Sequence, residues 1–447
     1  MNRLGAHAPV LPLLAVVVLL ALPLGPGGEG GAGPADAVSA LVVLFCAVLL
    51  VRDRRRPLSR TAALVLGLPV LGVAVAAMGA VSPGAGLTGL GRYLQVFVLV
   101  PAAVLLLVRD RGDFRLLAWS FVGLAVWQGA VGVHQYVTRT GASYQGRPVR
   151  AVGTFGAQDV MGMATVVSLG LVCAVGLALG TAPVRHRLIA LAGALVLLPP
   201  LALSFSRGAW IATAVACGAQ LLLSGLRRAL TAGAVVAAAS VILVGGFGVG
   251  TAMLQERISS ITRVADAPDQ SVTDRYTMWA AATGMWREHP VSGVGLKGFP
   301  EHRDSHASLA LSAGSDTAGA GAAFRRQPLL SPHNMYLLVL AEQGLIGLLA
   351  LAGSWLVLLL CAVRALWRTR RSGGPGLDCG LAACGLLVWQ LTDFAYADIG
   401  GPSTVLTALC FGLAAWWGLT AGSGLTPAVR PPAAPAPRHV AQEAPAR

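Results

Sequence analysis

The chain has 447 residues, of which 55% are hydrophobic and only 12% are charged. Apolar runs of roughly 17–25 residues recur along it, and no soluble domain has this composition. The net charge of +14 comes mostly from arginines in the short connections between these runs. Arginine at such positions fixes topology and meets anionic lipid headgroups, so we expect membrane lipids and no nucleic acid as partners.

The hydropathy pattern predicts an all-α polytopic membrane protein with one long extracytoplasmic loop that contains short amphipathic helices. About twelve transmembrane helices are expected, near residues 8–25, 35–51, 60–80, 91–108, 114–137, 158–180, 187–203, 208–224, 229–250, 333–363, 378–397 and 402–420. The chain then divides into helices one to nine (1–250), the loop (251–332), helices ten to twelve (333–420) and a disordered cytoplasmic tail (421–447).

The first apolar run could also be a secretory signal peptide, and we interpret it as a retained span. All seven cysteines fall inside predicted spans, which indicates apolar packing rather than a disulfide framework or a metal site.

Alternate connections along the chain are basic, which the positive-inside rule assigns to the cytoplasm. They lie at residues 52–56, 109–111, 185–187, 227–228 and 368–371. The protein is therefore expected in the cytoplasmic (inner) membrane with both termini cytoplasmic. The connections between these basic ones then lie outside, together with the 251–332 loop.

Within the loop, residues 274–289 predict an amphipathic helix. Thr273 could cap its start, and Pro290 with Gly293 would end it. Such a helix could lie on the outer membrane interface with its tryptophans at headgroup level.

Three polar blocks stand at this outer boundary. Ser204-Phe205-Ser206-Arg207-Gly208-Ala209-Trp210 opens one span, Asp274-Arg275-Tyr276 lies in the loop, and Ser331-Pro332-His333-Asn334-Met335-Tyr336 opens another span that contains Glu342. With the segment from Trp286 to Gly295, these blocks in this order resemble the O-antigen ligase and polymerase-like family, over roughly residues 150–400.

The resemblance implies a metal-independent membrane glycosyltransferase that needs no cofactor and works on the outer face of the cytoplasmic membrane. It would take a glycan from an undecaprenyl-diphosphate carrier and join it to an acceptor glycan, lipid or protein. The resemblance carries the family's catalytic residues onto Arg207, Arg275 and His333.

The chemistry of these three side chains agrees with the catalytic roles that the resemblance implies. Arginine pairs with phosphate oxygens bidentately and keeps its charge, so Arg207 and Arg275 suit a diphosphate. His333 could accept the proton of the acceptor hydroxyl, and attack opposite the leaving group predicts inversion. The structural alternatives are an interfacial anchor for Arg207, a solvated first-turn residue for Arg275 and a helix-capping residue for His333.

Four further residues are candidate substrate-binding groups. Glu342 should face the protein interior, where it could orient His333, pair with an arginine or be purely structural. Asn334 adjoins His333, Arg287 adds positive charge unless it is simply a solvated surface residue, and Asp393 could position the acceptor together with Asp398.

Two other functions stay open, a transporter of small anions and a flippase of lipid-linked glycans. A transporter should contain interrupted, polar helices at mid-membrane. A flippase should carry charges on several helices around a central cavity. The polar groups of this sequence gather instead at the outer boundary, which favours the enzyme, although ligase and polymerase are not separated.

Overall fold

The structure is a computed structural model that describes residues 8–23, 33–53, 58–144, 147–225, 230, 270–312, 315–316, 326–327, 329–401 and 403–420. In these ranges the chain is predominantly helical. The helices are η1 (Ala8–Val10), α2 (Leu11–Leu19), α3 (Pro34–Asp53), α4 (Arg60–Met78), α5 (Pro83–Leu94), η2 (Gln95–Leu99), α6 (Val100–Leu107), α7 (Arg111–Thr138), η3 (Gly153–Gln158), α8 (Gly162–Leu179), α9 (Val184–Leu203), α10 (Arg207–Ser224), α13 (Gln270–Glu288), α14 (Phe299–His306), α15 (Met335–Arg371), α16 (Leu377–Asp393) and α17 (Thr404–Leu419).

Two short antiparallel ribbons accompany the helices. β1 (Ala142–Tyr144) pairs with β2 (Arg147–Arg150), and β3 (Ser315–Asp316) pairs with β4 (Arg326–Gln327). Apart from these two short ribbons the described chain is helical, which confirms the main feature of the predicted all-α membrane protein.

Among the residues that the structure describes, seven helices are long and apolar enough to cross a membrane. They are Pro34–Arg52, Arg60–Met78, Pro83–Leu107, Arg111–Thr138, Gly162–Leu179, Val184–Leu203 and Met335–Arg371. The prediction of about twelve transmembrane helices is not confirmed by these seven candidate spans. α10, α16 and α17 have 18, 17 and 16 residues and do not meet the same criterion.

Two predicted spans differ in extent. α2 has nine residues, or about 14 Å of helix, roughly half the thickness of a hydrocarbon core. The fourth span begins at Pro83 rather than near residue 91, because α5 continues through a π-helical turn into α6. The predicted span 229–250, the basic pair 227–228, the boundary near residue 250 and the tail 421–447 lie outside the described residues.

Side-chain caps begin several of these helices at the expected polar residues. The hydroxyls of Ser59, Ser82 and Ser206 accept backbone N–H groups at the starts of α4, α5 and α10. The Asp110 carboxylate does the same for α7. Each cap satisfies a backbone donor that the first helical turn leaves without a partner.

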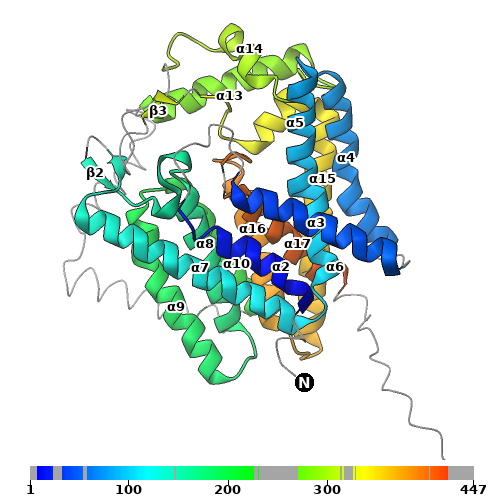
Figure 1. Ribbon diagram of the computed structural model, residues 1–447, viewed down its shortest axis with the longest axis vertical. Coiled ribbons are helices and arrows are strands. Elements are labelled where there is room, and N and C mark those ends of the chain that lie inside the picture. Colours follow the sequence, from blue (N-terminus) through cyan, green and yellow to red (C-terminus); the bar gives the residue numbers. More distant parts are fainter. Residues whose placement is uncertain are drawn as a thin grey trace, which may run out of the picture.

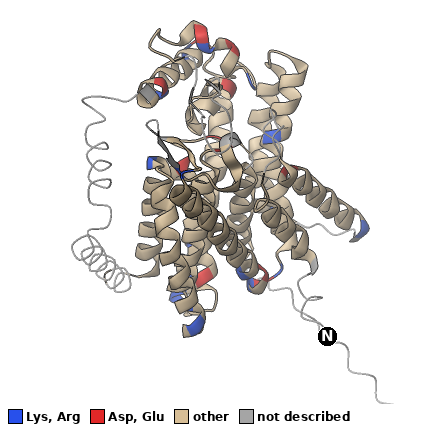
Figure 2. Cartoon of the chain, turned by 60° about the vertical axis from the view of Figure 1, so that its left-hand side comes forward, with Lys and Arg blue, Asp and Glu red and all other residues tan. Residues whose placement is uncertain are grey.

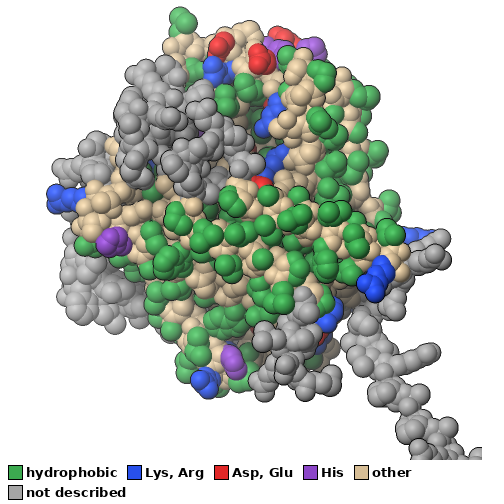
Figure 3. Space-filling model, in the orientation of Figure 1, with side chains coloured by type: hydrophobic (Ala, Val, Ile, Leu, Met, Phe, Trp, Pro, Cys, Tyr) green, Lys and Arg blue, Asp and Glu red, His purple; other side chains and the backbone are tan. Residues whose placement is uncertain are grey.

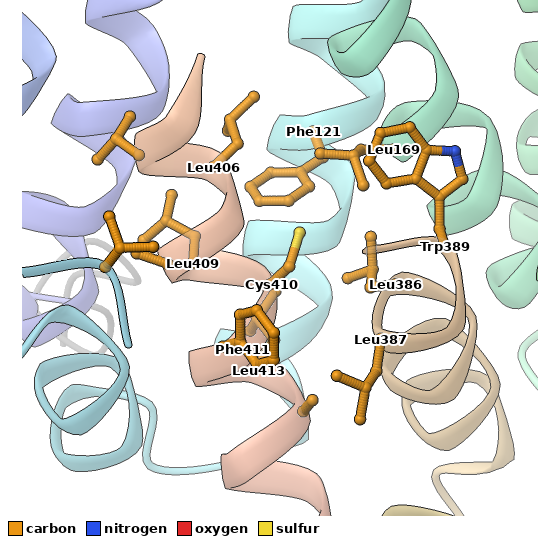
Figure 4. Close-up of a cluster of buried hydrophobic side chains, with 14 of the residues drawn as sticks. Phe121, Leu169, Leu386, Leu387, Trp389, Leu406, Leu409, Cys410, Phe411 and Leu413 are labelled. Atoms are coloured by element: carbon orange, nitrogen blue, oxygen red, sulfur yellow. The ribbon is translucent and has the colours of Figure 1, made fainter. Parts of the chain in front are cut away.

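α16 and α17 lie at the centre of the bundle (Figure 1). Their apolar side chains meet Phe121 of α7 and Leu169 of α8 in one buried cluster (Figure 4). Elsewhere glycines let helices approach closely. A Cβ on Gly72 of α4 would lie 2.6 Å from the Cα of Gly347 in α15, which is the small-residue contact typical of membrane helices.

The two ends of the bundle differ in composition. At one end, the Asp378 carboxylate at the start of α16 accepts two hydrogen bonds from Arg115 of α7, one of them 3.0 Å long. Arg370 of α15 donates to the Leu223 carbonyl of α10 at the same end. Charged side chains gather toward the ends, while the middles of the helices are almost free of them (Figure 2). In space-filling view a broad hydrophobic surface crosses the middle of the molecule (Figure 3).

The opposite end carries α13 and α14, which lie across the ends of the upright helices (Figure 1). α13 begins at Gln270, about one turn before the predicted start, and ends at Glu288, just before Pro290 as expected. Its buried residues Met278, Ala282 and Met285 belong to the common core. α13 is therefore packed onto the bundle through its apolar face.

Candidate active site

The Ser-Arg-Gly block forms a sharp connection between α9 and α10. Phe205 adopts a left-handed conformation with φ of 51°, which is rare for a bulky residue and typical of functional segments. Ser206 then caps α10, so that the half-buried Arg207 is the first helical residue. A cationic side chain at a helix N-terminus adds to the positive end of the helix dipole and makes the position suitable for an anion.

The Pro-His-Asn block is held by the segment that follows α16. His333 is also left-handed, with φ of 49°. The Asn334 side chain caps α15 by accepting from the Leu337 N–H at 3.1 Å, and it donates to the Ala395 carbonyl at 3.1 Å. The Met335 N–H donates to the Phe394 carbonyl at 2.8 Å. The structure thus gives Asn334 two protein contacts, and substrate binding by it stays a prediction.

Asp398 approaches this block from the C-terminal side. Its Oδ2 accepts a hydrogen bond from the Ser331 hydroxyl and lies 3.9 Å from Nδ1 of His333. Oδ1 of Asp398 accepts the Gly400 N–H at 2.9 Å. The sequence placed Asp398 near the outer end of its span but gave no signal that it would face His333, since the two residues are 65 positions apart.

Arg275 reaches the same place from α13. It interacts electrostatically with both His333 and Asp393. The indole N–H of Trp279, one helical turn further on, donates to the Pro332 carbonyl at 2.9 Å and so seats α13 on the Pro-His-Asn block. Neighbouring Asp274 accepts hydrogen bonds from the backbone and hydroxyl of Ser312 at 2.8 and 2.6 Å.

The protonation of His333 is set by three influences of different sign. Burial is the largest and lowers its pKa below 6.5, Asp398 opposes this by raising the pKa, and Arg275 lowers it again. The side chain is nevertheless 44% exposed. The lowered pKa favours the neutral imidazole over the charged form, and the exposed part of the ring is open to a reactant.

Arg207 lies at the start of α10, which packs against the segment that follows α16 and carries Asp398. A Cβ on Gly208 would lie 3.1 Å from the Cβ of Tyr396, so the start of α10 packs against the turn that leads to Asp398. The three predicted catalytic residues thus belong to segments that meet at one end of the bundle, opposite the Arg115–Asp378 pair.

The remaining predicted residues are placed differently. Asp393 is the last residue of α16 and lies near Arg275. Arg287 is exposed near the other end of α13, twelve residues or about 18 Å of helix from Arg275. Glu342 is buried, with 3% of its surface exposed, as expected for a carboxylate in a span. Its Oε1 accepts the Phe299 N–H at 3.3 Å, and Lys297 is its nearest cationic neighbour.

Arg92 was not predicted at all. It lies inside the span that begins at Pro83, forms an ion pair with the buried Asp36 of α3, and donates to the Gly401 carbonyl at 3.0 Å. Asp159 supports the same segment by accepting the Ser403 N–H at 3.1 Å. A charged residue at the start of the predicted span 91–108 was the signal that could have drawn attention to Arg92.

Among the residues that the structure describes, no three His, Cys, Asp or Glu side chains come together as metal ligands would. We therefore assign no metal site to this part of the chain.

Residues 190–352 match the family model described as O-Antigen ligase. The match includes the Ser-Arg-Gly block, α13 and the Pro-His-Asn block, and it ends before Asp393 and Asp398. A search of curated proteins found no match for the chain. The family match confirms, over these residues, the resemblance to the O-antigen ligase family noted in the sequence.

Proposed function

Because the chain carries a domain of the O-antigen ligase family, we propose that it transfers or polymerises a glycan from an undecaprenyl-diphosphate carrier onto an acceptor. The acceptor is a glycan, a lipid or a protein hydroxyl. The observation that carries the proposal is the convergence of Arg275, His333 and Asp398 at one end of the bundle.

The two arginines are proposed to hold the donor. A polyprenyl diphosphate concentrates negative charge at headgroup height, and the guanidinium groups of Arg207 and Arg275 can pair with its oxygens. As the glycosidic bond breaks, charge builds on the departing diphosphate. The arginines then stabilise the transition state more than the bound donor, which accelerates the reaction.

His333 is proposed as the general base. Its Nδ1 faces Asp398, which leaves Nε2 to accept the proton of the acceptor hydroxyl. The acceptor oxygen forms a new bond to the anomeric carbon while the bond from that carbon to the diphosphate oxygen breaks, and undecaprenyl diphosphate leaves. Attack from the opposite side inverts the anomeric configuration.

The outer face of the cytoplasmic membrane is the proposed location. The basic connections 109–111, 185–187 and 368–371 meet at the end of the bundle opposite the site, as the contacts of Arg187 with Ala178 and of Arg370 with Leu223 support. The positive-inside rule assigns such an end to the cytoplasm. Both termini would then be cytoplasmic.

The test is glycan transfer in proteoliposomes that contain polyprenyl-diphosphate oligosaccharide and candidate acceptors. Arg207→Ala, Arg275→Ala and His333→Ala should each abolish transfer at matched levels of folded protein. Arg185→Ala is the matched control, because it removes an exposed arginine from the end of the bundle opposite the site. Transfer that survives all three site substitutions would refute the mechanism.

One observation favours the transporter alternative, because α15 is interrupted at Gly344 beside a buried carboxylate, as transporter helices often are. However, the backbone groups of this break are bonded by a protein segment, and Glu342 accepts a backbone N–H. Anion flux by proteoliposomes in which glycan transfer is silent would favour transport over the enzyme.

A further inference from the structure

α15 (Met335–Arg371) consists of two helical halves that are separated by a break at Gly344. At Gly344 the backbone leaves the helical conformation, with φ of 62° and ψ of −161°. A break inside a membrane helix exposes backbone groups that find no water in the hydrocarbon core, so it is stable only where protein satisfies them. The segment from Pro290 to Phe299, which we name the 290–299 clamp, lies against this break.

The clamp bonds to both halves of α15. On the N-terminal side, the N–H groups of Val294 and Gly295 donate to the carbonyls of Ala341 and Glu342 at 2.9 and 3.0 Å. On the other side, the N–H groups of Leu345 and Ile346 donate to the carbonyls of Pro290 and Val291 at 3.0 and 3.2 Å. Four backbone groups that the break sets free are thereby paired.

Two glycines make this approach possible. Gly293 and Gly344 have φ of 69° and 62°, a conformation that glycine adopts without steric penalty. A Cβ on Gly344 would overlap the Val291 carbonyl, and a Cβ on Gly293 would overlap the backbone of Glu342 and Gln343. Any larger residue at either position would push the clamp and α15 apart.

Two more bonds fix the far part of the clamp. The Leu296 N–H donates to the Ala76 carbonyl of α4 at 3.1 Å, and the Phe299 N–H, at the start of α14, donates to the Glu342 carboxylate at 3.3 Å. The clamp therefore joins α4, α14 and α15 at one place.

The clamp follows α13 directly, so it also joins the helix that carries Arg275 to the helix that His333 precedes (Figure 1). A second link between these two parts is the hydrogen bond from the Trp279 indole to the Pro332 carbonyl. Two sets of contacts thus set the separation of Arg275 and His333. One is the hydrogen bond from Trp279 to Pro332, beside the reacting groups, and the other is the clamp at the helix break of Gly344.

We propose that the 290–299 clamp is a positioning element that sets the separation of Arg275 and His333, with Gly344 and Glu342 as its positioning residues. The inference rests on the proposed function, since it assigns the clamp's purpose to glycan transfer. Misplacing a reacting group by about 1 Å can reduce a rate about 100-fold.

A structural measurement tests the clamp without any assay of activity. Spin labels are placed at Ala280 of α13 and Leu349 of α15, both exposed, in a variant without the native cysteines. Pulsed electron paramagnetic resonance then gives the distance distribution between them. Gly344→Ala and Glu342→Ala should shift or broaden it, whereas Glu342→Gln should not, because an amide oxygen still accepts the Phe299 N–H.

Gly373→Ala is the matched control. Gly373 has a φ of 61°, almost the same as that of Gly344, but a Cβ there would have no neighbour within 4 Å. The substitution adds a side chain at a glycine of positive φ without the steric overlap, so the label distances should not change.

Transfer kinetics supply the second measurement. Gly344→Ala and Glu342→Ala should lower kcat by about 100-fold with KM changed much less, while Glu342→Gln and Gly373→Ala remain near wild type. Loss of kcat with unchanged label distances would overturn the proposal, and so would unchanged kcat with altered distances. A silent wild type with altered distances would refute the proposed function and leave the clamp as the determinant of geometry.

Discussion

Nδ1 of His333 lies 3.9 Å from Oδ2 of Asp398, and the same carboxylate oxygen accepts the Ser331 hydroxyl. The carboxylate is therefore shared between the histidine and the serine of one short block. This relationship connects the region matched by the family model with a residue 46 positions beyond its end.

The pair predicts a change in pH dependence. In the proposed mechanism transfer needs neutral His333, whose pKa is lowered by burial and raised by Asp398. Asp398→Asn removes the raising influence, so the pKa falls further and the acid limb of the rate profile moves to lower pH. The plateau rate should also fall, because a weaker base accepts the proton less readily.

The measurement is kcat/KM for glycan transfer between about pH 4.5 and 8. Asp304→Asn is the control, since Asp304 is exposed on α14 and forms an ion pair with Arg303. An acid limb that stays in place or moves to higher pH in Asp398→Asn would contradict the assigned relationship.

Arg207→Lys should be a poor substitute for the native residue. Lysine keeps the charge at the start of α10 but loses the planar fork that binds two phosphate oxygens at once. We expect a loss of at least tenfold in kcat, compared with a loss of 10²–10³-fold for removal of a preorganised donor. Steady-state transfer rates at matched protein levels check this, and full activity in Arg207→Lys would show that charge alone suffices.

The Arg92–Asp36 pair predicts a non-additive effect on stability. The side chains are only 16% and 7% exposed, so Arg92→Met leaves a buried carboxylate without its cation and should lower the free energy of unfolding by about 3–5 kcal/mol. Adding Asp36→Leu removes that carboxylate and should restore much of the loss. Thermal unfolding in detergent measures both, and additive losses would argue against the pair.

A comparison at the two ends of the molecule separates buried from exposed ion pairs. Asp378 is fully buried beside Arg115, so Asp378→Asn should lower the melting temperature by several degrees. Asp304→Asn should leave it unchanged, because Asp304 is 77% exposed next to Arg303. Equal shifts in the two variants would show that burial is not the deciding factor.

The sequence predicted those parts of the fold that depend on local composition. The span expected at 35–51 is the helix Pro34–Asp53, because its apolar run is unbroken and polar residues flank it. The start at Pro83 was missed because glycines and Arg92 lower the hydropathy of residues 83–94. The break at Gly344 was missed because no proline marks it, and the packing of the clamp explains it.

For the candidate site, the motifs located the segments and the structure supplied their relations. The sequence indicated three catalytic candidates, because they belong to polar blocks on the outer side that resemble the O-antigen ligase family. These candidates are Arg207, Arg275 and His333. That Asp398 faces His333 depends on tertiary packing that no local pattern encodes. The distance of Arg287 from Arg275, by contrast, follows from the predicted helix 274–289, which contains both residues.

The position of Asp398 also has a consequence for biogenesis. The carboxylate that faces His333 is synthesised near the end of the chain, and its segment is held by Arg92 and Asp159, which are made much earlier. A nascent protein in the translocon cannot complete the site until its last two helices have emerged and docked. In the proposed mechanism the polypeptide therefore cannot transfer glycan for most of its synthesis, and we expect premature termination after α15 to leave it without activity.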